Sequence, residues 1–255
     1  MYTDWLIDIL RSPETLKPIK YNGTNFESEE KEYEVIDNIL SIVYPEDIGG
    51  TEEKFNKLCN LFAPLYDINE RVMGRILAGV NMIKWRRKIV SFLELKSGMK
   101  ILEVSPGHGI FQKFLRDDVG EKGELVALDL SMGMLRQCQK RNEALKVQFI
   151  QGNAQFLPFD DNSFDAVYHF RGVNLFNDPQ KAINEFIRVV KKDGIVSWGD
   201  EGFSESYKKK LRMKILLKLN PDFSKPHPLI PDTIYDVKEN LVYDGLSYLI
   251  VAKKR

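Results

Sequence analysis

Two glycines, Gly107 and Gly109, lie in a turn that the stretch ILEVSPGHGIFQKFL predicts between a strand and a helix. An acid, Glu103, lies near the end of the aliphatic run before the turn. Because glycine has no side chain, backbone N–H groups in such a turn can approach a ligand closely. The N-terminus of the following helix favours a negatively charged group. These residues therefore indicate a ligand-binding turn at the tip of a strand.

Two kinds of cofactor site share such a turn, one for a dinucleotide and one for S-adenosylmethionine. The dinucleotide fingerprint G-x-G-x-x-G uses its third glycine to pack helix against strand, and Gln112 occupies that position here. Asp129 ends the next predicted strand, where a carboxylate can accept hydrogen bonds from both ribose hydroxyls. The missing glycine and the acid Glu103 favour S-adenosylmethionine and leave an NAD-dependent oxidoreductase as the least favoured alternative.

Four stretches resemble, in order and at the proper spacing, the motifs of class I S-adenosylmethionine-dependent methyltransferases. They are ILEVSPGHG, VALDLSMGML, GNAQFLPFDDNSFDAV and AINEFIRVVKKDG. The resemblance is to the branch that includes the ubiquinone/menaquinone-biosynthesis methyltransferases, and LYDINERV and KWRRKIV resemble the N-terminal helices of that branch. It covers about residues 55–200 and implies an enzyme with S-adenosyl-L-methionine as cofactor and S-adenosyl-L-homocysteine as product.

The resemblance also implies roles for single residues of the first motif. Glu103 would position the amino-acid end of the cofactor, through its ammonium group or a water. The turn itself would consist of Ser105, Pro106, Gly107 and Gly109, with Ser105 where the family has its first glycine.

Further roles follow for the other end of the cofactor. Asp129 would bind the ribose, and Leu130 would pack against the adenine. Asn153 stands where the family has an aspartate that faces the adenine amino group, with Ala154 beside it. Tyr66 would lie in a helix that folds over the methionine portion.

Candidates for catalysis lie in YHFRGVNLFND, at the end of the fourth strand of the fold. A sulfonium methyl group is a strong electrophile, so positioning of the nucleophile could supply roughly 7–11 kcal/mol. A base that removes a proton would add about 10²–10⁴-fold. His169 is either that base or a histidine hydrogen-bonded beneath the cofactor, and Arg171 either orients an anionic substrate or pairs with a carboxylate.

Short aliphatic runs alternate with helical patterns between residues 100 and 200, which is typical of an α/β fold with a parallel sheet. We expect a Rossmann-like, seven-stranded, mostly parallel sheet that ends in an antiparallel pair around Asp244-Gly245. Strands are predicted near 100–105, 124–129, 147–151, 164–169 and 194–198, and helices near 109–117, 132–144 and 179–191. Gly194 is expected as a left-handed helix C-cap. Residues 53–96 are expected to form helices that cover the sheet.

Residues 1–50 differ in pattern and are expected to form a small N-terminal module, with the methyltransferase domain over 51–255. The module resembles the small zinc-ribbon-like domain that partners or precedes some methyltransferases. Ser12, Thr15 and Ser28 lie where that family supplies cysteines, so we expect a metal-free fold that covers substrate or mediates contacts.

Composition sets further bounds on this chain of 255 residues. Its formal net charge is zero, which argues against general binding of nucleic acid. We expect no transmembrane segment and a cytoplasmic location, because no apolar run is long enough and acids replace the basic start of a signal peptide. Cys59 and Cys138 suit neither a disulfide framework nor a metal site. The basic stretch 206–219 predicts either weak contact with a membrane surface or a solvated helix face.

The acceptor is expected to be a small or lipid-like molecule, methylated by in-line transfer. The alternative is a catalytically silent subunit that keeps the cofactor fold and serves as a partner. Oligomeric state has no signal in the sequence.

Overall fold

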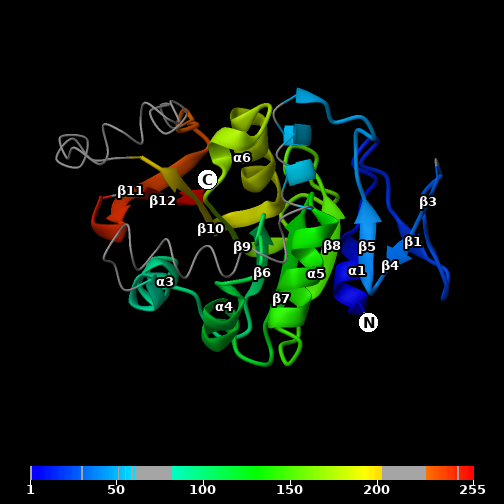
Figure 1. Ribbon diagram of the computed structural model, residues 1–255, viewed down its shortest axis with the longest axis horizontal. Helices are drawn as coiled ribbons and strands as arrows, with labels where there is room; N and C mark the ends of the chain where they lie inside the picture. Colours follow the sequence, from blue (N-terminus) through cyan, green and yellow to red (C-terminus); the bar gives the residue numbers. More distant parts are fainter. Residues whose placement is uncertain are drawn as a thin grey trace.

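A nine-stranded sheet forms the centre of the computed structural model (Figure 1), which describes residues 2–29, 31–50, 52–54, 56–58, 60, 82–202, 228–245 and 247–255. Its strand order is β11-β12-β10-β9-β6-β7-β8-β5-β4. The strands are β4 (Val35–Ile36), β5 (Ile39–Ile42), β6 (Lys100–Val104), β7 (Glu124–Asp129), β8 (Gln148–Gly152), β9 (Phe164–Phe170), β10 (Val190–Glu201), β11 (Ile234–Val242) and β12 (Ser247–Lys254).

The seven strands from β6 to β12 confirm the expected fold. β6 pairs in parallel with β7 and β9, β7 with β8, and β9 with β10, whereas β12 is antiparallel to β10 and β11. The chain adds β7 and then β8 on one side of β6. It then crosses back and adds β9 on the other side of β6, so the strand order reverses between β6 and β9. In open α/β sheets, ligands bind outside the carboxyl ends of the strands at such a switch point.

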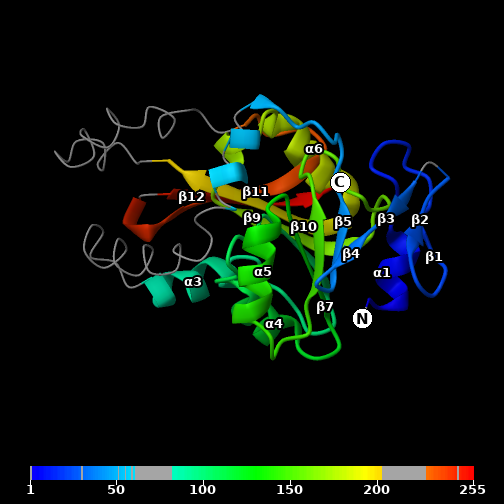
Figure 2. The ribbon, with the colours of Figure 1, turned by 45° about the vertical axis from the view of Figure 1, so that its right-hand side comes forward.

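Helices cover both faces of this sheet (Figures 1 and 2). On one face α1 (Asp4–Ile9) and α6 (Pro179–Val189) contribute to a large apolar core. On the other face α3 (Met82–Ser91) and α4 (Gln112–Val119) share a core with β6, and α5 (Met132–Arg141) packs on β7 and β8. Because both faces are covered, β6 and β7 are almost continuously apolar, as buried parallel strands are.

The first fifty residues are joined to the main sheet. β5 pairs in parallel with β8, β4 pairs with β5, and Leu6 and Leu10 lie in the same core as α6. These two strands are additional to the seven that the sequence predicts. Three short strands, β1 (Lys20–Tyr21), β2 (Phe26–Glu27) and β3 (Glu32–Tyr33), form a separate small sheet. The domain boundary near residue 50 remains a prediction.

The end of α6 differs from its sequence prediction. Gly194 is not a left-handed C-cap, because the C-cap is Val190, in an extended conformation, and β10 begins there directly. The left-handed residue is Asp193, with φ 59°. Glycine is nevertheless needed at 194, since a Cβ atom there would lie 2.9 Å from the carbonyl oxygen of Asp165.

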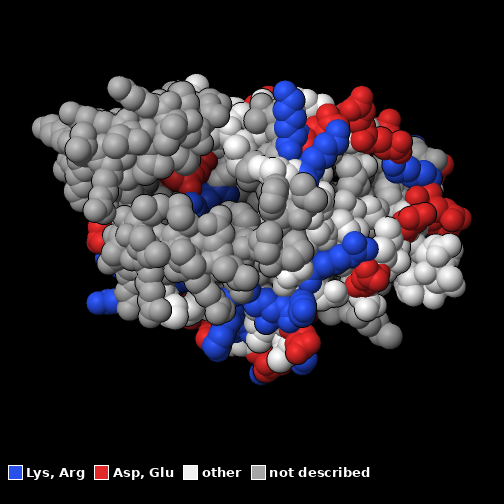
Figure 3. Space-filling view, in the orientation of Figure 1, with Lys and Arg blue, Asp and Glu red and all other residues white. Residues whose placement is uncertain are grey.

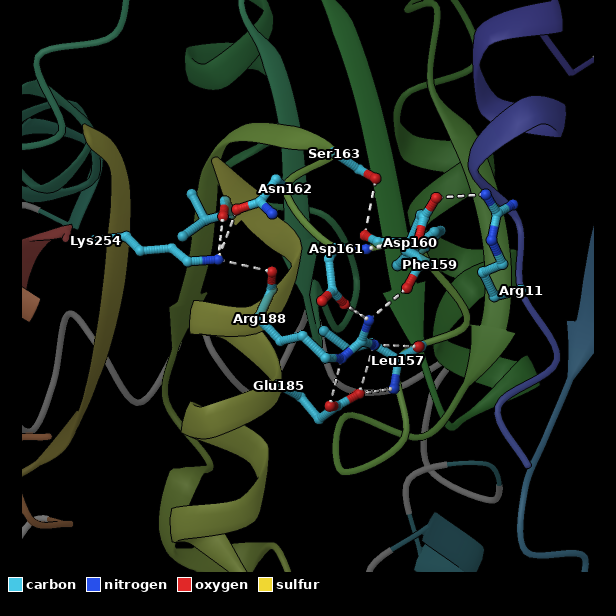
Figure 4. Close-up of polar contacts among 11 residues, drawn as sticks. Arg11, Leu157, Phe159, Asp160, Asp161, Asn162, Ser163, Glu185, Arg188 and Lys254 are labelled. Carbon is cyan, nitrogen blue, oxygen red and sulfur yellow. Dashed lines mark hydrogen bonds and ion pairs between the residues drawn. The ribbon is translucent and has the colours of Figure 1, made fainter. Parts of the chain in front are cut away.

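Arg188 of α6 joins several segments at the amino end of the sheet (Figure 4). Its guanidinium donates hydrogen bonds to the carbonyl oxygens of Leu157 and Phe159 and pairs with Glu185 and Asp161. Such a planar group with five donors suits several acceptors in fixed directions. The contacts fix the loop after β8 to α6.

Candidate cofactor site

The turn after β6 is the centre of the site. Ser105, Gly107 and Gly109 all have positive φ, at 53°, 55° and 78°. The backbone N–H of Ser105 donates to the carbonyl oxygen of Leu128 at 2.7 Å, so the turn begins beside the end of β7. Ser105 adopts a conformation that is costly for a residue with a Cβ atom, whereas the two glycines adopt it freely. The turn therefore has the shape that the sequence predicts.

The two glycines differ in their surroundings. A Cβ atom at Gly107 would meet no atom of the described residues within 4 Å, so these residues leave open space beside it. A Cβ atom at Gly109 would lie 2.4 Å from Nδ2 of Asn142 and 2.5 Å from Sγ of Cys138. Gly107 thus faces room for a ligand, and Gly109 packs tightly against α5.

Asp129 ends β7 next to this turn. One carboxylate oxygen accepts the N–H of Gly107 at 3.1 Å, and the other accepts the N–H of Ser131 at 2.9 Å. Burial raises the pKa of Asp129 to about 6, and these backbone donors oppose the shift. A carboxylate has about four acceptor positions, so acceptor capacity remains for further donors such as hydroxyl groups.

Glu103 lies on β6 directly below the turn and is 2% exposed. Oε2 accepts a hydrogen bond from Nε2 of Gln112 at 2.5 Å. Burial, with the nearby charge of Asp129, raises the pKa of Glu103 to about 8. The site thus has two buried acids on neighbouring strands, and the charge of Asp129 favours the neutral form of Glu103.

Asn153 and Ala154 follow the end of β8 and are both buried. Oδ1 of Asn153 accepts the backbone N–H of Gln155 at 2.9 Å, so this oxygen already has a donor within its own turn. Leu130 lies partly exposed after β7, and its carbonyl oxygen accepts a hydrogen bond from Gln151. These three residues and the glycine turn are therefore placed at the carboxyl ends of adjacent strands.

His169 of β9 is completely buried. Its Nδ1 lies 3.0 Å from the carbonyl oxygen of Val104, the last residue of β6, and its ring packs against Phe176 and Phe186. Nε2 has no hydrogen-bond partner in the described part of the chain, and burial lowers the pKa of the ring to about 4. A neutral imidazole that donates from Nδ1 fits this environment, so the geometry favours the histidine beneath the cofactor over the base. The catalytic role itself is untested.

Arg171 follows β9 with φ 74° and pairs with Glu201 at 2.6 Å. Next to it, Asp200 is 1% exposed and accepts the backbone N–H groups of Gly172 and Asn174. Burial raises the pKa of Asp200 to about 8, with a further contribution from the neighbouring carboxylate. Of the two readings of Arg171, the pairing with a carboxylate is the one seen here, and a role in orienting substrate stays a prediction.

Comparison with known proteins identifies the family. The model of the ubiE/COQ5 methyltransferase family matches residues 49–207. The chain belongs to this family. A demethylmenaquinone methyltransferase of Listeria welshimeri is 31% identical over 146 residues, which cover 56% of this chain and 60% of the relative. Another, from Renibacterium salmoninarum, is 37% identical over 135 residues and 52% of each chain. The chain thus matches only about half to three fifths of the length of these relatives.

A solved structure supports the fold of this ubiE/COQ5 family member. Phosphoethanolamine N-methyltransferase 2 of Haemonchus contortus, in complex with S-adenosyl-L-methionine, has a TM-score of 0.60 at 17% identity. The match covers 83% of this chain and 61% of that protein. At this identity the likeness concerns the fold alone. The expected methyltransferase family, with S-adenosylmethionine as its cofactor, is confirmed.

Three polar residues near the site of this ubiE/COQ5 family member were not predicted from the sequence. Gln155 donates a hydrogen bond at 2.5 Å to Glu52, which is 7% exposed. Asn60 accepts the N–H of Gly133, in the first turn of α5, at 2.7 Å. Glu52 and Asn60 are both helical, as are the other described residues of 52–54 and 56–58. The contacts cross more than 70 positions of sequence, so no local spacing could have indicated them.

Some predictions fall outside the described residues, namely those on Tyr66, Cys59 and the basic stretch 206–219. In the described part of the chain, no helix is long and apolar enough to cross a membrane. The same residues contain no group of three or more His, Cys, Asp or Glu side chains that could hold a metal ion. Cys138 is buried with a free thiol.

Proposed function

We propose that this protein transfers a methyl group from S-adenosylmethionine to a small, quinone-like or lipid-like acceptor. The observation that carries the proposal is the pair formed by the open glycine turn and Asp129, whose carboxylate holds Gly107 and keeps acceptor positions for ribose hydroxyls. Membership of the ubiE/COQ5 family supports the reaction, and the name of the demethylmenaquinone methyltransferases it resembles supports a quinone-like acceptor.

The described residues fit such a cofactor. Glu103 would hold the ammonium group of its amino-acid end, the N–H groups of the turn would approach its carboxylate, and Asp129 would hold its ribose. Leu130, Asn153 and Ala154 would line the adenine. When bound, the cofactor supplies the electrophilic methyl group, so the chain must hold the acceptor in line with that group and exclude water.

The surface agrees with a small acceptor rather than a polyanion. In the part of the face in Figure 3 that is described, groups of Lys and Arg side chains lie near groups of Asp and Glu side chains. Neighbouring groups of opposite sign weaken each other's field, whereas binding of a nucleic acid backbone is favoured by a surface of one sign.

Calorimetry with S-adenosylhomocysteine tests the cofactor step. We expect binding of one molecule per chain, and no detectable heat at millimolar ligand would overturn the proposal. The acceptor step is tested by formation of S-adenosylhomocysteine from S-adenosylmethionine, with a panel that includes hydroquinones with an unsubstituted ring position, matched fully substituted hydroquinones and simple amines. Turnover confined to the unsubstituted hydroquinones is expected, and turnover confined to amines would refute the quinone-like acceptor.

A catalytically silent partner subunit is the second candidate. It is favoured by the state of the two candidate catalytic side chains, because His169 is fully buried and Arg171 is paired with Glu201. Such a subunit would bind S-adenosylhomocysteine and show no turnover with any acceptor, so the two assays above separate the candidates.

A further inference from the structure

Gln112 contacts the acid of the cofactor site from the first turn of α4. Its side chain is completely buried, and Nε2 donates to Oε2 of Glu103 at 2.5 Å. The same position would hold the third glycine of a dinucleotide site, so a long polar side chain replaces a close helix–strand contact.

The other described groups around Glu103 offer it no positive charge. Asp129 lies on the neighbouring strand β7, Tyr168 is the residue opposite on β9, and the thiol of Cys138 faces it from α5. Among the described residues, Gln112 is the hydrogen-bond donor to this carboxyl group. Burial and Asp129 favour its neutral form, and the amide of Gln112 opposes both.

We propose that Gln112 is a positioning residue of the cofactor site, whose amide holds the carboxyl group of Glu103 in the orientation and the charged form that bind an ammonium group. The inference rests on the proposed function. A side-chain N–H₂ group can only donate, so it stabilises a carboxylate more than a carboxylic acid in the same place. The ammonium group of the ligand would then meet a carboxyl group that is already oriented and easier to ionise.

The polar set around Glu103 is incomplete in the protein alone. Oε1 of Gln112 and the hydroxyl group of Tyr168 are both buried, and neither has a hydrogen-bond partner among the described residues. Unpaired buried polar atoms are costly, and native proteins retain few of them. Their position beside Glu103 is the second observation that associates Gln112 with binding rather than with packing alone.

Calorimetric titration of the full chain with S-adenosylhomocysteine between pH 6 and 9 tests this role. Gln112→Leu keeps the volume and removes the donor, and we expect it to weaken binding about tenfold at pH 7. Affinity should rise with pH in both proteins, and in the variant the rise should occur about one pH unit higher, because Glu103 is harder to ionise. The titration of the ligand affects both proteins equally, so the ratio of their affinities at each pH does not depend on it.

Leu115→Ala is the matched control, because it removes a buried side chain from the same helix without touching Glu103. It should lower the melting temperature and leave the pH profile of binding unchanged. The effect of Gln112→Leu should also disappear in a Glu103→Gln background. If leucine at 112 prevents folding, Gln112→Asn, which shortens the amide, should give the same shift of the profile.

The outcomes separate the two proposals. A wild type that binds, with variants at position 112 that keep its affinity and pH profile, would overturn the role of Gln112 alone. The role would also be overturned if Gln112→Leu caused the same loss of affinity in the wild type and in the Glu103→Gln background. A wild type that does not bind would overturn the proposed function and this inference with it.

Discussion

The carboxylate of Asp129 accepts the backbone N–H of Gly107 at 3.1 Å, so the acid at the end of β7 holds the turn at the end of β6. The contact joins β6 to its parallel neighbour β7 at the carboxyl ends of both strands. A side chain that shapes the turn and keeps acceptor positions for a ligand has both a structural and a binding role.

Asp129→Ala should therefore weaken binding of S-adenosylhomocysteine by about 1.5–3 kcal/mol, the usual cost of a hydrogen bond to a charged group. Calorimetry measures the change. Asp129→Asn keeps one oxygen acceptor and should lose less. Equal affinity in all three proteins would mean that Asp129 shapes the turn without contacting the ligand.

Substitution of Gly107 and of Gly109 by alanine should distinguish an effect on ligand binding from an effect on the stability of the fold. At Gly107 a methyl group meets open space, so Gly107→Ala should lower the free energy of unfolding by only about 1 kcal/mol, from its positive φ, and should weaken cofactor binding strongly. Gly109→Ala adds a clash with Asn142 and Cys138 and should cost at least about 2 kcal/mol of stability. Urea denaturation with parallel calorimetry measures both effects. The reverse order of stability losses would contradict the geometry.

Ser105→Gly should stabilise the protein by up to about 1 kcal/mol. Release of the positive φ of 53° outweighs the larger entropy that glycine adds to the unfolded chain. Ser105→Ala is the control, since it removes the hydroxyl group and keeps the Cβ atom, and it should show no gain. Urea denaturation of the three proteins decides the point, and a gain for both variants would assign the effect to the hydroxyl group.

His169 should make the fold sensitive to acid. Burial lowers the pKa of its ring from 6.5 to about 4, so the unfolded chain takes up a proton first. The stabilising contribution is present above pH 6.5 and is lost as the pH falls toward 4, by an amount on the order of 3 kcal/mol. His169→Asn keeps a donor near Nδ1 and cannot be charged, so its melting temperature should fall less between pH 7 and 4.5.

The same variant tests the catalytic role of His169. If the ring only supports the turn through Val104, turnover of an accepted substrate should remain within about tenfold of the wild type. A loss of 10²–10⁴-fold would instead indicate a general base.

The sequence predicted the parts of this fold that depend on local pattern. The expected strand at 100–105 is β6, and that at 124–129 is β7, because buried parallel strands read as unbroken aliphatic runs. The positions of the glycine turn after β6 and of Asp129 at the end of β7 follow from local sequence too, and their roles in binding stay predictions. Gly194 was misassigned because a bulge in β10, with Asp193 in the left-handed region, replaces the expected helix cap.

What the sequence could not show depends on contacts between distant segments. The burial of His169 follows from packing against Phe176 and Phe186, and a strand pattern does not reveal which side of a sheet a helix will cover. The hydrogen bond between Glu52 and Gln155 joins residues 103 positions apart. Only the folded chain brings such pairs together.

The pairing of β5 with β8 has a consequence for the order of folding. Ser41 of β5 donates a hydrogen bond to Gln151 of β8, 110 positions later. During synthesis β5 therefore leaves the ribosome long before β8 has been made. Closure of so long a loop has a high entropic cost and is slow. During synthesis the short hairpin of β4 and β5 therefore forms before β8 is available to pair with it. A chain that lacks residues 1–42 would leave β8 as an open edge on which other chains could aggregate.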